Sequence, residues 1–242
     1  STAAQLLQRV LAGRDVACRL AERAPHVALR RGAVSHGAEG YALTIASDGI
    51  TITAANDAGA WYAVQTLREL LRAHGLALPC GRIDDWPDFA RRGVFLDISR
   101  GRVPTLACLL ELVPLLPHWK INELQFNVEN TFRFRRHPAI GQGYSPLTPA
   151  DITVLQRACK AHHIRLVGAF ASFGHTEKIL QLPRYTELGE LPGHQGFPGG
   201  TTLCPTDPRS IKLIEELYAE YAPLFEATDF NIMCDEPWEL GK

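Results

Sequence analysis

Two neighbouring stretches near the start of the chain alternate apolar and polar residues with a period of two. They are Tyr41–Ala46 and Ile50–Ala55, and Ser47-Asp48-Gly49 joins them. Alternation puts successive side chains on opposite faces of a strand, and a short connection containing Asp-Gly suits a tight reversal. The pattern therefore predicts a β-hairpin.

Helical spacing flanks this hairpin on both sides. Ala3–Leu11 has the apolar spacing of a short helix. A longer helix is predicted from Asn56 or Asp57 to about His74, because either residue can cap it and apolar residues recur three or four positions apart. Gly75 then ends the helix. The first part of the chain therefore predicts a small α+β domain, with a sheet, a covering helix and no catalytic cluster.

After about residue 84 the pattern changes to strands alternating with helices. The four predicted strands are Val94–Ile98, Ile121–Val128, Ile164–Phe170 and Asp229–Met233. Helices are predicted to begin near Pro104, Thr148 and Asp207, with Pro114 kinking or ending the first and Thr148 and Asp151 forming a capping box. This order indicates an α/β domain with parallel strands and crossover helices.

Composition and charge narrow the function classes. The 242 residues include 25 Lys+Arg and 26 Asp+Glu, and 46% are hydrophobic. The hydrophobic share excludes a disordered chain, and balanced charge without a basic run argues against a nucleic-acid partner. No apolar stretch approaches the ~18 residues of a membrane span, so no membrane association is expected. Charges interrupt the first 25 residues, which therefore do not look like a secretory leader.

The cysteine spacing points to a reducing environment. The six cysteines are Cys18, Cys80, Cys108, Cys159, Cys204 and Cys234. They lie tens of residues apart with no C-x-x-C pair, which argues against a disulfide framework or a zinc knuckle. We expect mostly buried thiols, and a cytoplasmic location is favoured.

Polar and ionisable residues gather just past the carboxyl end of each predicted strand in the α/β part. They are Asp97, Ser99 and Arg100 after the first strand, Glu129 and Asn130 after the second, Ser172 and His175 after the third, and Asp235-Glu236 after the fourth. Functional sites of parallel α/β folds form at this edge of the sheet. The pattern therefore predicts one convergent pocket.

Each residue also has a simpler structural explanation. The alternatives are an ion pair for Asp97 and Arg100, ordinary loop positions for Glu129 and Asn130, a helix cap for His175, a solvated charge for Arg92, and core packing for Trp86 and Trp238. None of these explains two adjacent carboxylates that follow the mostly apolar strand ending at Met233. Crowding two acids raises the pKa of at least one, which keeps a carboxyl group protonated for general acid catalysis.

Two rival chemistries for Asp235-Glu236 follow from the neighbouring residues. A metal site is one, although H-E-x-x-H is absent and His162-His163 end a predicted helix away from this edge. A nucleophilic pair of Cys234 and His175 is the other, supported by spacing alone. The residues leave these alternatives open.

Several motifs, taken in order, resemble one enzyme family. They are the run Arg92–Arg100 (RGVFLDISR) with Asp85-Trp86-Pro87 before it, Lys120-Ile121-Asn122 before the second strand, Gly174-His175 after the third, and Asp235-Glu236 after the fourth. They resemble family 20 glycoside hydrolases, the exo-acting β-N-acetylhexosaminidases. Residues up to about 84 resemble the small α+β domain that precedes the catalytic barrel of that family. The resemblance covers nearly the whole chain.

The resemblance implies a role for each site residue. Glu236 would be the general acid/base and Asp235 would orient the 2-acetamido group of the substrate, whose oxygen attacks the anomeric carbon in place of an enzyme nucleophile. Arg92 would hold sugar hydroxyls and His175 would support the acid. The second strand lacks the family's His-Trp-His motif, and Glu129 would stand in for an acid that follows it. Met233-Cys234 replace the usual glycines, as in a divergent branch.

Three further expectations follow from the resemblance. Trp238 is a further candidate for substrate binding. The substrate would be a carbohydrate with a terminal β-linked N-acetylhexosamine. No cofactor and no metal are required.

Length completes the sequence-based interpretation. Residues 86–242 carry four strand–helix signals, whereas an eight-fold barrel needs about 250 residues. The predicted fold is therefore a small α+β N-terminal domain over residues 1–85, followed by the first half of a (β/α)8 TIM barrel over residues 86–242. The alternative to an active enzyme is a catalytically inactive half-barrel, at most a sugar- or partner-binding module. Its uncovered edges would favour self-association.

Overall fold

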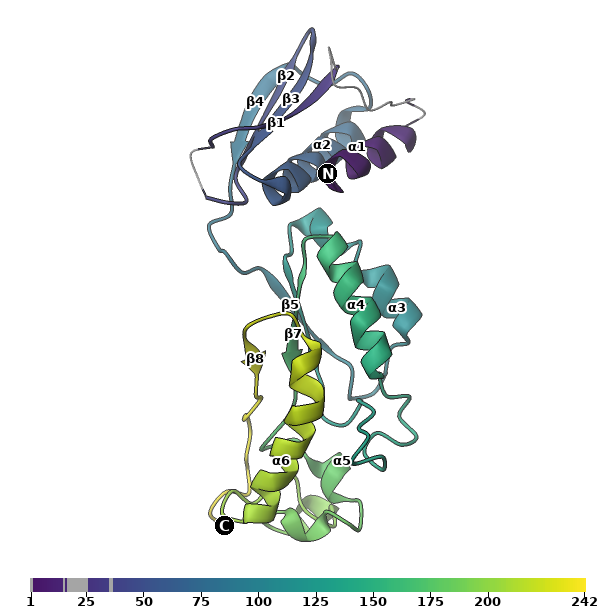
Figure 1. The fold of residues 1–242 in the computed structure, drawn as a ribbon, viewed down its shortest axis with the longest axis vertical. Helices are drawn as coiled ribbons and strands as arrows, with labels where there is room; N and C mark the ends of the chain where they lie inside the picture. Colours follow the sequence, from purple (N-terminus) through teal and green to yellow (C-terminus); the bar gives the residue numbers. More distant parts are fainter. Residues whose placement is uncertain (1, 15, 17–25, 35–36) are drawn as a thin grey trace. The chain divides into compact units, whose positions relative to one another are not determined.

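The computed structural model describes residues 2–14, 16, 26–34 and 37–242. Cys18 lies outside these residues, as do residues 15 and 17–25 of the stretch that does not look like a secretory leader. The chain folds into two compact units. The small unit comprises Ser1–Arg92 and Leu116–Lys120, and the large unit comprises Gly93–Leu115 and Ile121–Lys242. Each unit has its own four-stranded sheet (Figure 1).

The sheet of the small unit contains the predicted hairpin. Its strands are β1 (Val27–Arg31), β2 (Tyr41–Ala46), β3 (Gly49–Ala54) and β4 (Gly81–Asp85), in the spatial order β1-β3-β2-β4. β2 and β3 pair antiparallel with Ala46 opposite Gly49, so the hairpin is confirmed. β1 lies parallel to β3, and β4 lies antiparallel to β2. The charged residues of β1 and β4 break the alternation that would have marked them as strands.

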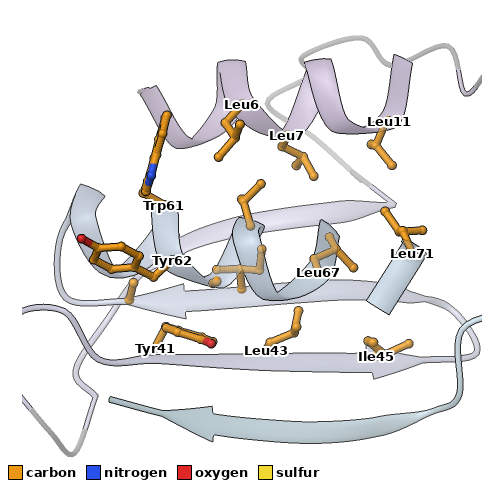
Figure 2. Close-up of a cluster of buried hydrophobic side chains, with 14 residues drawn as sticks. Leu6, Leu7, Leu11, Tyr41, Leu43, Ile45, Trp61, Tyr62, Leu67 and Leu71 are labelled. Atoms are coloured by element: carbon orange, nitrogen blue, oxygen red, sulfur yellow. The ribbon is translucent and has the colours of Figure 1, made fainter. Parts of the chain in front are cut away.

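Two helices complete the small unit, α1 (Thr2–Ala12) and α2 (Asp57–His74). The Asn56 side chain caps α2 by accepting hydrogen bonds from the backbone N–H groups of Ala58 and Gly59 at 3.0 and 3.1 Å. Gly75 ends the helix with φ 67°, a left-handed conformation that glycine adopts without strain. Figure 2 shows the core that results, with leucines of α1 pointing toward α2 and the sheet.

The large unit has a sheet of four parallel strands, in agreement with the predicted α/β class. They are β5 (Gly93–Asp97), β6 (Glu123–Asn127), β7 (Arg165–Ala169) and β8 (Phe230–Asn231), paired in chain order. β8 is shorter than predicted and has one neighbour, β7. It ends at Asn231, two residues before Met233, whose φ of 44° is incompatible with a continuing strand.

Helices join consecutive strands of this sheet as predicted. α3 (Leu106–Leu112) stops two residues before Pro114, and a 3₁₀ turn, η1 (Leu116–Trp119), follows in the small unit. α4 (Pro149–Ala161) begins with the predicted capping box of Thr148 and Asp151. α6 (Pro208–Tyr221) is capped by Asp207, whose side chain accepts from the backbone N–H of Arg209 at 2.8 Å. The shorter elements between them are α5 (Glu177–Leu180), η2 (Thr186–Leu188), η3 (His194–Gly196) and η4 (Ala222–Leu224).

Aromatic side chains fill the interior of the large unit. Phe132, Phe134, Phe170 and Tyr221 are each about 1% exposed or less and contact one another edge to face or at a tilt. Trp86 and Trp238 do not belong to a core: they are 42% and 57% exposed. The core-packing alternative for these two tryptophans was therefore wrong. Within the described part of the chain, every helix is too short or too polar to span a bilayer.

Candidate active site

The parallel register brings four loops to one edge of the large sheet. Asp97 ends β5 and Asn127 ends β6 directly beside it. β7 and β8 follow in the same direction, so their carboxyl ends meet the same edge. The segments that follow carry the polar residues singled out from the sequence. Strand direction thus explains why residues up to 139 positions apart converge.

His175 lies between the two adjacent acids. Its Nε2 atom is 3.2 Å from Asp235 Oδ2 and 3.2 Å from Glu236 Oε2. The imidazole side chain is 17% exposed, whereas the Asp235 and Glu236 side chains are 60% and 52% exposed. A mostly buried imidazole therefore supports two carboxylates that remain open to a ligand.

The backbone around this triad is unusual at three positions. Met233, Glu236 and His175 have φ values of 44°, 49° and 56°, in the left-handed region that side-chain-bearing residues rarely adopt. Such conformations persist only where the surroundings enforce them, and they cluster at functional sites. Asn231 precedes this loop, and its Oδ1 atom accepts a hydrogen bond from the Met233 backbone N–H at 3.1 Å. The loop after β8 is thus held in a defined, strained shape.

Gly174 lets the loop after β7 approach the two acids closely. A Cβ atom at this position would lie 2.2 Å from the Asp235 carbonyl oxygen and 2.9 Å from that of Glu236. Both distances are far shorter than a carbon–oxygen contact allows. The glycine is therefore required for His175 to reach the carboxylates.

Gly174→Ala is expected to destabilise the 242-residue chain by about 1–3 kcal/mol, because the new methyl group must displace the backbone of Asp235 and Glu236. Urea unfolding measures this loss. Gly81→Ala is the matched control, since no atom lies within 4 Å of a Cβ there and the backbone is not left-handed. Equal unfolding free energies for the two variants would show that the close approach is not rigid.

Glu129 is the fully buried acid of this edge, with 0% exposure. Arg100 Nε lies 3.0 Å from its Oε1 atom, but neither carboxylate oxygen accepts a hydrogen bond from the described residues. The backbone N–H of Glu129 donates to Ser99 Oγ at 2.8 Å, which fixes the loop after β6 to the loop after β5. Burial raises the pKa of Glu129 to about 7, against the opposing charges of Arg100 and His175.

The raised pKa of Glu129 predicts a pH-dependent stability. Because the folded chain holds this proton more tightly than the unfolded chain does, stability falls as the pH rises from about 4.5 to about 7. The loss reaches at most about 3 kcal/mol. Glu129→Gln is expected to remove this component, so unfolding free energies at pH 5 and pH 8 should differ less in the variant. Exposed Glu226→Gln is the control, and parallel pH profiles for wild type and Glu129→Gln would contradict the prediction.

Arg100 is held between two carboxylates. Its Nε atom lies 2.9 Å from Asp97 Oδ2 and 3.0 Å from Glu129 Oε1, so the ion pair of Asp97 and Arg100 is confirmed. Burial opposes ionisation of Asp97, but hydrogen bonds from the backbone N–H groups of Ser99 and Arg100 outweigh it and lower the Asp97 pKa. Since the Arg100 side chain is still 51% exposed, the charge remains accessible to a ligand.

Arg92 has a different environment from the other candidates. It belongs to the small unit and precedes the amino end of β5, whereas the other candidates follow carboxyl ends. Its guanidinium donates to Glu39 Oε2 at 2.6 Å and to the carbonyl oxygens of Lys120 and Phe89 at 2.7 and 2.8 Å. All three nitrogens are thus engaged within that unit. A sugar-binding role for Arg92 stays a prediction, and Arg100 is the arginine beside Glu129.

Glu239 is a structural acid that sequence reasoning missed. Its side chain is fully buried and accepts hydrogen bonds from the backbone N–H groups of Thr201 and Thr202 at 2.8 to 2.9 Å. His194 Nδ1 lies 2.8 Å away. Burial opposes ionisation, but these donors lower the Glu239 pKa. The glycines that precede Thr201 were the available signal, because a glycine-rich loop can present backbone N–H groups to a carboxylate.

Glu239 anchors the segment that carries the two acids. The Trp238 backbone N–H, one residue earlier, donates to the Glu236 carbonyl oxygen at 2.8 Å and closes a tight turn. The Trp238 side chain is left 57% exposed. The loop is thus fixed at both ends, at Asn231 and at Glu239.

Comparison with known proteins gives this geometry its context. Residues 1–86 match the family described as glycosyl hydrolase family 20, domain 2. A β-N-acetylhexosaminidase of Cellulomonas fimi is 32% identical over 196 residues, covering 72% of this chain and 38% of that protein. Flavobacterium johnsoniae chitobiase superimposes with a TM-score of 0.82 at 25% identity, covering 98% of this chain and 39% of that one. The chain belongs to glycoside hydrolase family 20.

A second solved structure of this family supports the same conclusion. The family 20 β-N-acetylhexosaminidase from Streptomyces coelicolor A3(2) superimposes with a TM-score of 0.81 at 25% identity, over 96% of this chain and 52% of that protein. The chain thus spans between about two fifths and half of the length of these relatives. By family it is a glycoside hydrolase, with a mixed α/β fold.

The structure bears differently on the two rival chemistries, a metal site and a nucleophilic pair of Cys234 and His175. Ligand atoms of His175, Asp235 and Glu236 lie within 4.8 Å of one another, and no further His, Cys, Asp or Glu of the described residues joins the group. A metal alternative thus rests on the same three residues as the acid/base pair. Cys234 Sγ contacts Ser172 Oγ at 3.4 Å and the Ile232 carbonyl oxygen at 3.8 Å, not His175. A nucleophilic pair of Cys234 and His175 is therefore not formed.

Proposed function

We propose that this family 20 chain carries the acid/base apparatus of an exo-acting β-N-acetylhexosaminidase. The reaction is hydrolysis of a terminal β-linked N-acetylhexosamine with retention of configuration, assisted by the acetamido group of the substrate. The observation that carries the proposal is the position of His175 between the two adjacent, half-exposed acids Asp235 and Glu236.

Glu236 acts as the general acid and then as the general base. As the acid it donates a proton to the glycosidic oxygen while the bond to the anomeric carbon breaks. As the base it then takes a proton from the water that attacks the same carbon. His175 Nε2, at 3.2 Å, keeps the carboxyl group oriented through both steps.

Asp235 stabilises the acetamido group of the sugar. As the acetamido oxygen attacks the anomeric carbon, its nitrogen becomes positively charged, and an ionised carboxylate beside the N–H stabilises that charge. The oxazolinium-type intermediate then opens by water attack. Each step inverts the anomeric carbon, so the net result is retention without an enzyme nucleophile.

The remaining candidates form the rest of the sugar site. The half-exposed Arg100 offers hydrogen-bond donors for sugar hydroxyls, and Arg92 stays a second candidate for that role. Glu129 holds Arg100 in place and has two carboxylate oxygens without hydrogen-bond donors among the described residues, as expected for a group that meets a ligand. The exposed indole of Trp238 offers an apolar face for a sugar ring.

We further propose that the large unit is the amino-terminal half of a (β/α)8 barrel. Four parallel strands in chain order, joined by helices, are half of the barrel repeat. Residues 1–85 then form a non-catalytic domain and residues 86–242 belong to the catalytic domain. This division agrees with the position of all the proposed catalytic residues on β7 and β8 loops.

The proposed function is tested with aryl glycosides and the protein expressed from its full reading frame. It is expected to release the chromogenic aglycone from an aryl β-N-acetylglucosaminide or β-N-acetylgalactosaminide, but not from the aryl β-glucoside, which lacks the acetamido nucleophile. Equal turnover of the β-glucoside would contradict substrate assistance. No turnover of either N-acetylhexosaminide would contradict the proposed function.

A further inference from the structure

The small unit has a concave surface lined by four arginines, outside the residues proposed for catalysis. Its volume is about 370 Å³. Its lining includes Leu6, Arg9, Val10, Arg14, Arg68 and Arg72. They come from α1, the turn that follows it, and the second half of α2. No basic run marks this surface in the sequence, because helix packing brings the arginines together from two separate segments.

Among the described residues, one carboxylate, that of Glu69, is paired with an arginine of this pocket. Arg72 pairs with Glu69 at 2.9 Å, whereas the side chains of Arg9 and Arg14 have no ion-pair or hydrogen-bond partner among the described residues. Arg68 contacts His118 Nε2. Burial, and next the charge of Arg68, lower the His118 pKa, which disfavours a further positive charge beside the arginines.

Structural explanations account for only part of this arrangement. α1 and α2 both end beside the pocket, and a helix carboxyl end favours nearby cations with about half a negative charge. Two such ends and one carboxylate do not balance four guanidinium groups. Arg68 and Arg72 also lie four positions apart on one helix face, where like charges destabilise the helix. An anionic ligand would relieve this repulsion.

We propose that the arginine pocket of the small unit binds the sulfate or phosphate ester group of a sugar. Guanidinium groups bind tetrahedral oxyanions through paired, charge-assisted hydrogen bonds. Val10, which packs partly buried against the core, adds a small apolar contact beside the arginines, against which the edge of a sugar ring can lie. The volume lies in the range of small-molecule sites and exceeds the needs of a lone inorganic anion. The small unit would then contribute its own recognition of charged glycans.

The test is a calorimetric titration of the 242-residue chain with glucose 6-sulfate, with glucose 6-phosphate and with glucose, none of which carries the acetamido group that the proposed catalytic residues would bind. The pocket variant is the double substitution Arg9→Gln and Arg72→Gln. The matched control is Arg30→Gln with Arg31→Gln, two exposed arginines of β1 in the same unit, which removes the same charge. All four positions are exposed, and thermal unfolding of each variant checks that the fold is retained.

The expected result is binding of at least one ester by the wild type and by the control variant. In the pocket variant, Kd should rise tenfold or more, about the effect of losing one charge-assisted hydrogen bond. The sulfate and phosphate arms identify which ester is preferred. Equal Kd values in pocket and control variants, or no binding of either ester by the wild type, would overturn the proposal. Because the readout is binding of sugars without an acetamido group, neither result depends on the proposed hydrolysis.

Discussion

Glu236→Gln is expected to lower kcat for an unactivated disaccharide by about 10³-fold or more, or about 4 kcal/mol of transition-state stabilisation. Glutamine keeps the size of the side chain and its place 3.2 Å from His175, but it cannot donate a proton to the glycosidic oxygen. The loss should be much smaller for an aryl substrate with a good leaving group, because that oxygen departs without protonation. The measurement compares kcat for the two substrates in wild type and variant.

The control for this comparison is Glu187→Gln, which removes an acid that is 84% exposed and whose side chain pairs with Arg209. It should leave both rates unchanged. If Glu236→Gln slowed the aryl substrate and the disaccharide equally, Glu236 would not be the proton donor to the leaving group. If neither rate changed, the assignment of Glu236 as a catalytic residue would be wrong.

Local sequence signals predicted the elements that local physics controls. The hairpin of Tyr41–Ala46, the Asn56 cap and the capping box of Thr148 and Asp151 each depend on residues a few positions apart. The parallel direction of the large sheet followed from the alternation of strands and helices. Together with Asp235-Glu236, that direction was sufficient to predict the edge at which His175 and the two acids lie together.

What the sequence could not predict depends on contacts between distant residues. Arg92 belongs to a motif that suggests a sugar-binding role. The sequence does not reveal that its guanidinium donates hydrogen bonds to Glu39, 53 positions earlier, and to the Lys120 carbonyl oxygen. From the sequence alone, Glu239 would be expected on the surface. In the structure it is buried, because the distant loop around Thr201 donates hydrogen bonds to its carboxylate. β8 is shortened by the left-handed backbone at Met233, a residue type that gives no warning of that conformation.

The family resemblance and the physical reasoning contributed different parts of the site. Adjacent carboxylates indicate acid/base chemistry, but nothing in their spacing distinguishes a hydrolase from a metal site. The resemblance supplied the acetamido mechanism and the separate roles. The structure then added the burial of Glu129, which raises its pKa, and the close approach at Gly174. Those two features are properties of this chain that neither line of sequence reasoning contained.

Asp235→Asn is expected to lower kcat by about 10²- to 10³-fold while changing KM far less. The ionised carboxylate interacts most strongly with the positive charge that develops on the acetamido nitrogen, so its loss raises the transition state more than the bound ground state. Asparagine keeps the shape and a carbonyl oxygen near His175, which preserves the loop after β8. The measurement is kcat and KM for an aryl β-N-acetylglucosaminide.

A series of substrates makes the assignment of Asp235 specific. Replacing the acetamido methyl hydrogens by one, two or three fluorines weakens the carbonyl oxygen as a nucleophile, so wild-type kcat should fall steeply along the series. Asp235 stabilises the charge that this attack creates. The ratio of wild-type kcat to Asp235→Asn kcat should therefore be largest for the acetamido substrate and smallest for the trifluoro analogue. A variant whose rates fall in parallel with those of the wild type would mean that Asp235 acts elsewhere in the site. A rise in KM alone would reassign it to ground-state binding.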